Sequence, residues 1–280
     1  APFLALSAAA AVTSRIRLGT DIVVLPLHNP FEVAEQVSVL DVVSNGRAIL
    51  GVGLGYRKEE YMAFERDIKS KARLYENNLK SVKMLLEGSE LKAGAFSLSI
   101  YPRPVQQPRP PLWIAAKSDE AVAKAAHRGD AWIMDPVTDI NVLERRLKTY
   151  KDELKKLNKI VRDVPLRREV FISDDENELK RAAELMLESY WQDYYQCGHL
   201  QDNEGREIDP NDVDYKSIRE EVLERMIVCN SSYAIEKIDM YRKRLGTTEL
   251  LIKMSFPGIT HEMRVNSMKL IAEKVMPHLS

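Results

Sequence analysis

Residues Arg15–Tyr56 read RIRLGTDIVVLPLHNPFEVAEQVSVLDVVSNGRAILGVGLGY and contain two apolar segments separated by one with the signals of a helix. Ile16–Leu25 is short and rich in β-branched residues, which is typical of a strand buried on both faces. Asn29-Pro30 then predicts a helix start, since Asn caps the helix and Pro occupies its first turn, and Asn45-Gly46 predicts its end. Because a second short strand follows at Ala48–Gly51, this stretch predicts two parallel strands joined by a helix.

The same alternation continues to the end of the chain. Further strands are predicted at Leu112–Ala116, Ala131–Met134, Leu166–Ser173 and Glu249–Met254, and helices at Ala72–Leu86, Ser118–Arg128, Ile140–Lys159, Glu176–Tyr195, Ser217–Met226, Ser231–Leu245 and Thr260–Val275. Strands that alternate with helices predict a parallel sheet with helical crossovers. Periodicity alone leaves two architectures open, a closed barrel and an open doubly wound sheet.

Three segments depart from this alternation. Residues 1–12 are nearly all apolar and lack a preceding basic segment, so they indicate a buried helix rather than a signal peptide. Residues 96–111 are proline-rich and residues 197–215 are polar and acidic, and we expect both to be inserted loops. The whole chain, residues 1–280, is expected to form one domain, because α/β barrels commonly reach this length.

The overall composition is that of a globular enzyme with a sizeable core. Hydrophobic residues make up 45% of the chain and charged residues 30%, and 41 basic against 42 acidic residues give a net charge of -1. This balance gives no electrostatic reason to expect a nucleic-acid or membrane partner. Cys197 and Cys229 have no spacing typical of a metal site or a disulfide framework, which favours a reducing, cytoplasmic location and predicts no metal.

Four stretches carry a resemblance to a known family. Arg15–Pro30, Ala34–Tyr56 and Leu112–Trp132 resemble consecutive signature segments of luciferase-like flavin monooxygenases, and Ile227–Pro277 resembles that family's closing strand and helix. The resemblance implies a (β/α)₈ TIM barrel that binds reduced FMN, or in sister groups the deazaflavin F420, at the C-terminal ends of its strands. It also implies about two strand–helix units before a segment such as Ala1–Leu25, so we expect this chain to lack the N-terminal units of its barrel.

The resemblance further implies which residues contact the cofactor. Asp21-Ile22 falls where the family carries a non-prolyl cis peptide against the flavin ring, and Gly53 and Tyr56 align with a segment beside that ring. The region of Lys117-Ser118 binds the FMN phosphate in relatives, and free N–H groups at a helix start suit such a site. Arg73 aligns with a second basic position that relatives use for phosphate.

Other interpretations of these residues remain open. Asp21 can bond to a neighbouring backbone group, Arg73 can pair with Glu76, and Asp119 beside Lys117 repels a phosphate. The glycines at positions 51, 53 and 55 do not make a dinucleotide fingerprint, because Tyr56 stands where the third glycine is needed. His28 follows the C-terminal end of its strand and is the candidate catalytic residue, with an ordinary loop histidine as the alternative.

These features together predict a flavin-dependent monooxygenase. It would use O₂ and reduced FMN, supplied by a separate flavin reductase, to oxygenate a small organic substrate as a homodimer. One alternative is an F420-dependent oxidoreductase that transfers hydride on the same barrel. The other is a non-catalytic family member that binds flavin weakly or completes a dimer.

Overall fold

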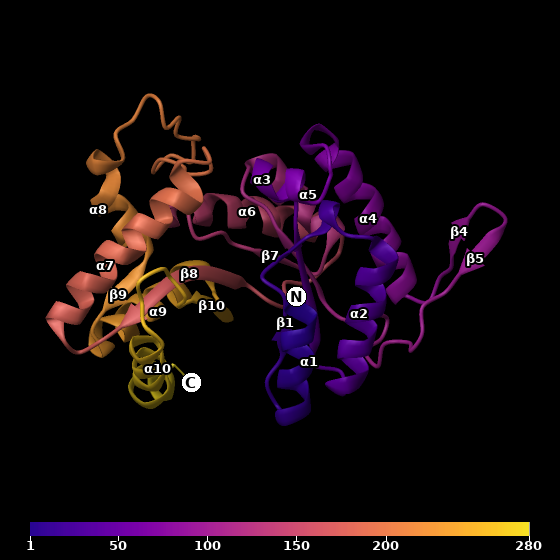
Figure 1. Cartoon of the computed structure of the whole chain (residues 1–280), viewed down its shortest axis with the longest axis horizontal. Coiled ribbons are helices and arrows are strands. Elements are labelled where there is room, and N and C mark those ends of the chain that lie inside the picture. The colour runs from indigo at the N-terminus through magenta and orange to yellow at the C-terminus, as the bar shows by residue number, and fades with distance from the viewer. Residues whose placement is uncertain (280) are drawn as a thin grey trace. The chain divides into compact units, whose positions relative to one another are not determined.

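The computed structural model describes residues 1–279, and the chain divides into two compact units. The first unit comprises Ala1–Ala115 and Arg128–Ala131, and the second comprises Ala116–His127 and the chain from Trp132 onward. In both units short strands alternate with longer helices, as the colour gradient of Figure 1 shows along the chain.

The first unit is built on parallel strands covered by helices. Its elements are α1 (Pro2–Val12), β1 (Leu18–Gly19), β2 (Val23–Val24), η1 (Leu25–Leu27), α2 (Pro30–Val43), β3 (Ala48–Gly53), α3 (Lys58–Ala63), η2 (Ile68–Ser70), α4 (Lys71–Leu86), β4 (Leu91–Ala93), β5 (Phe96–Leu98) and β6 (Leu112–Ala115). β3 pairs in parallel with β1, β2 and β6. β4 and β5 form a separate antiparallel hairpin, so the predicted loop at 96–111 begins with a strand.

The predicted strand at residues 16–25 is divided into β1 and β2. The hydroxyl of Thr20 explains the division, since it donates to the carbonyl of Gly51 at 2.8 Å and accepts from the Gly51 N–H at 3.0 Å. A side chain therefore takes the place of a backbone partner beside β3, and the chain between Thr20 and Val23 leaves the regular ladder.

Helix α2 has the ends that the sequence predicts. The Asn29 side chain accepts the N–H of Phe31 at 2.9 Å, and Pro30 occupies the first turn. After the last turn, Asn45 and Gly46 adopt φ values of 54° and 80°, the left-handed conformation that ends many helices. The apolar face of α2 packs against α4, and its buried side chains include Val33, Val37 and Leu40.

Helix α1 forms as predicted, but it is largely exposed rather than buried. Only Phe3 and Ala10 are buried among its eleven residues. Arg47 holds its C-terminal end, because the guanidinium donates to the carbonyls of Thr13 and Ile16, each at 2.8 Å. These bonds satisfy carbonyl groups that a helix end and the following loop leave without backbone partners.

The second unit continues the pattern of parallel strands and helices. Its elements are α5 (Asp119–Arg128), β7 (Ala131–Ile133), α6 (Ile140–Lys156), β8 (Pro165–Ile172), α7 (Glu176–Tyr190), a π-helical turn at Trp191–Tyr195, α8 (Tyr215–Arg225), β9 (Ile227–Cys229), α9 (Ser231–Leu245), β10 (Glu249–Lys253), α10 (His261–Leu270), a second π-helical turn at Ile271–Val275 and a 3-10 turn at Met276–His278. Arg128 and Ala131, the outermost residues of α5 and β7, belong to the first unit. The sheet order is β10-β8-β9, with both pairs parallel.

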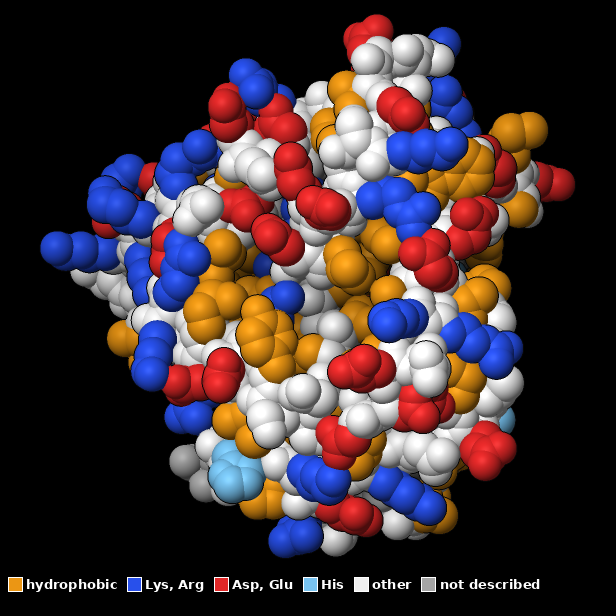
Figure 2. Space-filling model, turned by 90° about the vertical axis from the view of Figure 1, so that its left-hand side faces the viewer, with side chains coloured by type: hydrophobic (Ala, Val, Ile, Leu, Met, Phe, Trp, Pro, Cys, Tyr) orange, Lys and Arg blue, Asp and Glu red, His pale blue; other side chains and the backbone are white. Residues whose placement is uncertain are grey.

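Charged side chains cover much of the surface shown in Figure 2. On that face basic and acidic groups are interspersed around a central group of hydrophobic side chains. Within residues 1–279, no helix combines the length and the apolar composition needed to cross a membrane. Over the same residues, His, Cys, Asp and Glu side chains form no group of three or more that suits a metal ion.

Candidate functional site

The turn between β1 and β2 and the C-terminal end of β3 bring together three of the predicted cofactor residues. Val23 and Val24 of β2 pair with Val52 and Gly53 of β3, so the turn before β2 lies beside the end of β3. The peptide bond between Asp21 and Ile22 is cis, as the family resemblance implied. Asp21 is exposed and Ile22 is half-buried at this position.

Ile22 occupies the space next to Gly53. A Cβ built on Gly53 would lie 2.1 Å from Ile22 Cδ1 and 3.4 Å from the Cβ of Ala115, so any other residue there requires the Ile22 side chain to move. Gly55 is similar, since its φ is +73° and a Cβ would lie 2.4 Å from Val24 Cγ1. The two glycines therefore leave room for the aliphatic side chains of Ile22 and Val24.

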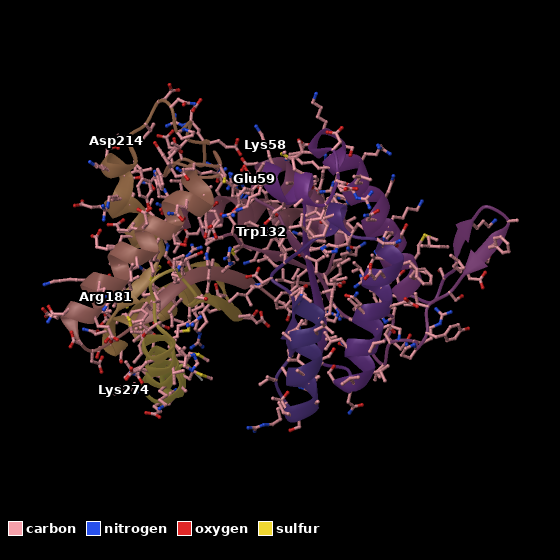
Figure 3. The ribbon with its side chains drawn as sticks, in the orientation of Figure 1. Lys58, Glu59, Trp132, Arg181, Asp214 and Lys274 are labelled. Atoms are coloured by element: carbon pink, nitrogen blue, oxygen red, sulfur yellow. The ribbon has the colours of Figure 1, made fainter. Side chains whose placement is uncertain are left out.

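Tyr61 closes the loop that follows β3. Its hydroxyl donates to the carbonyl of Leu54 at 2.6 Å, and burial raises the pKa of this phenol to about 12, so the group stays protonated. Tyr56 lies half-buried in the same loop, and Lys58 and Glu59, both labelled in Figure 3, open the exposed side of α3. The sequence pattern did not single out Tyr61, because an isolated tyrosine in a charged helix is an ordinary surface residue.

His28 is held directly after η1. Its carbonyl and that of Leu25 both accept from the Asn78 amide of α4, at 3.0 and 3.1 Å, and its ring meets the edge of Phe64 at 5.6 Å. Partial burial lowers the pKa of His28, and the nearby Glu32 carboxylate opposes this shift in part. The imidazole is therefore neutral at neutral pH and can both donate and accept a hydrogen bond.

Arg73 lies in the first turn of α4, and its side chain is exposed. Glu76, the alternative partner of Arg73, pairs instead with Arg128. The Arg128 guanidinium also lies over the ring of Tyr75. Arg73 is thus placed where a basic side chain can reach a solvent-borne anion. Helix α4 packs against η1, which carries the backbone from β2 to His28.

In the second unit, Lys117 and Ser118 precede α5 as predicted. The Ser118 hydroxyl accepts the N–H of Ala121 at 3.2 Å, so it caps the helix. The Lys117 ammonium donates to the carbonyl of His199 at 2.9 Å and pairs with Glu207 at 3.2 Å. Burial lowers the pKa of Lys117, and Glu207 and then Asp135 act in the opposite direction.

Trp132 fixes the backbone directly before Lys117. The indole N–H of this buried residue, labelled in Figure 3, donates to the carbonyl of Ala116 at 2.8 Å. His199, Glu207 and Trp132 were not predicted as site residues. His199 and Glu207 are 82 and 90 positions from Lys117, and no local pattern indicates contacts over that separation.

Comparison with known proteins agrees with this architecture. The profile of the luciferase-like monooxygenase family matches residues 1–247. The oxygenase component of flavin-dependent trigonelline monooxygenase from Acinetobacter baylyi is 28% identical over 193 residues, which are 66% of this chain and 54% of that protein. The chain spans about half the length of the curated relatives it matches, between 38% and 54% for three of them.

Two solved structures show the fold. The oxygenating constituent of 3,6-diketocamphane monooxygenase from Pseudomonas putida, in complex with FMN, matches with a TM-score of 0.72 at 18% identity, over 99% of this chain and 83% of that one. The coenzyme F420-dependent tetrahydromethanopterin reductase from Methanopyrus kandleri matches with a TM-score of 0.72 at 17% identity, over 100% of this chain and 88% of that one. The luciferase-like (β/α)₈ TIM-barrel fold predicted from the sequence is thereby confirmed.

Proposed function

Because the chain belongs to the luciferase-like monooxygenase family, we propose that it uses reduced FMN and O₂ to oxygenate a small organic substrate. The names of two similar proteins support this assignment, since one is a flavin-dependent oxygenase component and the other holds FMN. The trigonelline monooxygenase relative is the oxygenase component of its enzyme, which supports a separate flavin reductase as a partner of this chain. Both units are assigned to one barrel domain that spans residues 1–280.

The observation that carries the proposal is the packing of Ile22 and Val24 against the C-terminal end of β3 and the glycine loop that follows it. Ile22 and Val24 provide an aliphatic surface over Gly53 and Gly55, beside the exposed Asp21. A flat, largely apolar ring system fits such a surface, and a polar group at its edge fixes the orientation of the ring. We assign Asp21, Ile22, Gly53 and Tyr56 to the flavin ring on this basis.

Bound reduced FMN would supply the redox chemistry with O₂, and the protein groups would control its surroundings. The aliphatic side chains of Ile22 and Val24 would exclude water from a flavin ring bound against them. His28, with its lowered pKa, is the group assigned to hold or move a proton near the ring.

The phosphate of FMN is assigned to Lys117 and Ser118. Lys117 contributes an ammonium ion and Ser118 begins a helix whose free N–H groups favour an anion. The exposed Arg73 is the alternative phosphate ligand. Asp119 stays ionised, because the hydrogen bond from Arg146 at 2.6 Å lowers the pKa of its carboxyl, but the guanidinium charge of Arg146 offsets part of the repulsion that Asp119 exerts on a phosphate.

F420-dependent hydride transfer is the second candidate function, since an F420-dependent reductase has the same fold. Equilibrium titration with FMN and with F420, followed by protein fluorescence, separates the two. Tighter binding of FMN, and O₂-dependent turnover when a flavin reductase is added, are the expected results. Tighter binding of F420 would transfer the assignment to hydride transfer, and absence of binding by either would support a non-catalytic member.

We also propose that the protein is a homodimer. Helices α1 and α2 pack together, and they expose apolar side chains: Leu4 and Val12 of α1, and Val39, Val42 and Val43 of α2. The three valines share one helix face, since they are three and four positions apart. An apolar patch of this kind on a globular protein commonly marks an interface.

A further inference from the structure

A loop of the second unit covers the start of α5. This segment, His199–Glu207 (the cover loop), approaches Lys117 from both of its ends. The Lys117 ammonium donates to the His199 carbonyl at 2.9 Å, lies 3.2 Å from the His199 Nδ1 and pairs with Glu207 at 3.2 Å. The Lys117 side chain is only 11% exposed, so the loop and its surroundings remove most of the ammonium from water.

Two arginines of α6 hold the middle of the cover loop. Arg146 donates to the Gln201 side chain at 3.0 Å and to the Gly205 carbonyl at 3.4 Å, while also bonding to Asp119. Arg145 donates to the Glu204 carbonyl at 3.5 Å. The cover loop therefore presents oxygen atoms to three cations, Lys117, Arg145 and Arg146, in the way that a bound anion would.

The contacts of Lys117 with the His199 carbonyl and with the Glu207 carboxylate differ in how easily an anion can replace them. The His199 carbonyl belongs to the backbone and stays where the loop is anchored, whereas the Glu207 side chain is 67% exposed. An exposed carboxylate gains little from its ion pair, because water solvates it equally well. A nearly buried ammonium, in contrast, requires a negative partner. An incoming anion can therefore replace Glu207 while Lys117 remains paired.

We propose that Glu207 is an internal counter-anion of Lys117, which the anionic group of the ligand displaces, releasing this end of the cover loop. His199 is a positioning residue in this exchange, since its carbonyl keeps the ammonium directed to the same point. The identification of the anion as the FMN phosphate rests on the proposed function, whereas the displacement of Glu207 from Lys117 by an anion does not. Glu207 thus lowers the affinity for phosphorylated ligands without touching the ring.

The first test compares FMN with riboflavin, which lacks the phosphate. Dissociation constants are measured for the wild type, Glu207→Gln and Glu204→Gln. Glu204 is the matched control, because it lies in the same loop, is 69% exposed and pairs with Arg206. We expect Glu207→Gln to bind FMN about two- to tenfold more tightly, with riboflavin unchanged, and Glu204→Gln to leave both unchanged. Unchanged or weaker FMN binding by Glu207→Gln, or an equal gain in Glu204→Gln, overturns the proposal.

The second test needs no flavin. Amide hydrogen exchange across residues 199–207 is measured in inorganic phosphate and in chloride at equal ionic strength. Phosphate is expected to accelerate exchange in the wild type, and Glu207→Gln to exchange rapidly in both salts. If phosphate releases the loop but FMN does not bind, the displacement of Glu207 by an anion is supported and the cofactor assignment fails. If FMN binds but neither phosphate nor Glu207→Gln changes the exchange rate, Glu207 is not a displaceable counter-anion.

Discussion

Ile22 lies so close to Gly53 that Cδ1 would be 2.1 Å from any Cβ added at position 53. Gly53→Ala should therefore displace Ile22, lower the free energy of unfolding by about 1–3 kcal/mol and weaken FMN binding. Ile22→Val removes the overlapping Cδ1, so the double variant Gly53→Ala/Ile22→Val should recover most of both losses. Urea unfolding and FMN titration measure the two effects. Equal losses in the single and double variants would show that Ile22 is not the obstacle.

His28 should affect reactivity more than binding. His28→Phe keeps an aromatic ring against Phe64 but removes both nitrogens, so we expect reoxidation of bound reduced FMN by O₂ to change about tenfold or more while FMN affinity stays within about threefold. In the wild type the rate should follow the neutral imidazole. Because burial lowers its pKa, that form persists below the ordinary histidine pKa and is lost only as the pH falls further. Stopped-flow absorbance across pH 5–8 measures this pH dependence of the reoxidation rate. The same pH profile in His28→Phe would show that a group other than His28 causes it.

Lys117 should report on the phosphate. Lys117→Ala and Ser118→Ala are each expected to weaken FMN binding by about ten- to a hundredfold, or roughly 1.5–3 kcal/mol, and to leave riboflavin binding unchanged. Weaker FMN binding in Arg73→Ala alone would instead assign the phosphate site to the start of α4. The preference for FMN over riboflavin should also fall as rising pH deprotonates Lys117, while the phosphate remains dianionic. Since the pKa of Lys117 is lowered by burial, this fall should begin below the range of an exposed lysine.

The exposed valines of α2 should decide the oligomeric state. Val39→Asp together with Val43→Asp places two charges on the apolar face, and we expect the dimer dissociation constant to rise by at least about a hundredfold. Ile160→Asp is the matched control, since Ile160 is equally apolar and 72% exposed but lies after α6. Sedimentation equilibrium gives the constants. A monomeric wild type, or equal effects at positions 39/43 and 160, would exclude this face as the interface.

The elements with strong local signals were predictable. Asn29-Pro30 and Asn45-Gly46 gave both ends of α2, because capping and left-handed conformations depend on single residues. The strand at Ile227–Cys229 and the β4–β5 hairpin were not predicted, since three-residue strands are too short to show a period. Helix α1 was expected to be buried, and most of its apolar residues are exposed. Hydrophobicity indicates which side chains favour burial but does not identify what covers them.

The site was predictable only where it follows strand ends. Asp21 and Ile22 follow β1 and lie beside the end of β3, because β1 and β2 both pair in parallel with β3 and the turn between them runs along that strand. The cover-loop contact between Lys117 and Glu207 depends instead on how a long insertion folds back. Its oxygens come partly from the backbone, which carries no side-chain signal. The tight packing of Ile22 against Gly53 was equally hidden, since a glycine-rich turn has the same sequence whether its surface is bare or covered.

The Thr20 side chain supplies hydrogen bonds that a neighbouring strand normally supplies from its backbone. By bonding to both polar groups of Gly51, it completes the hydrogen bonding of a central strand while its own chain turns away. Substitutions at residues 21 and 22 therefore leave these two hydrogen bonds of the neighbouring strand in place. Position 20 itself accepts few residues. Serine preserves the hydroxyl, whereas valine, equal in shape, would leave two buried groups of Gly51 without hydrogen-bond partners. A saturation library at position 20 should accordingly retain folded clones mainly with threonine and serine, although valine is the closest match in volume.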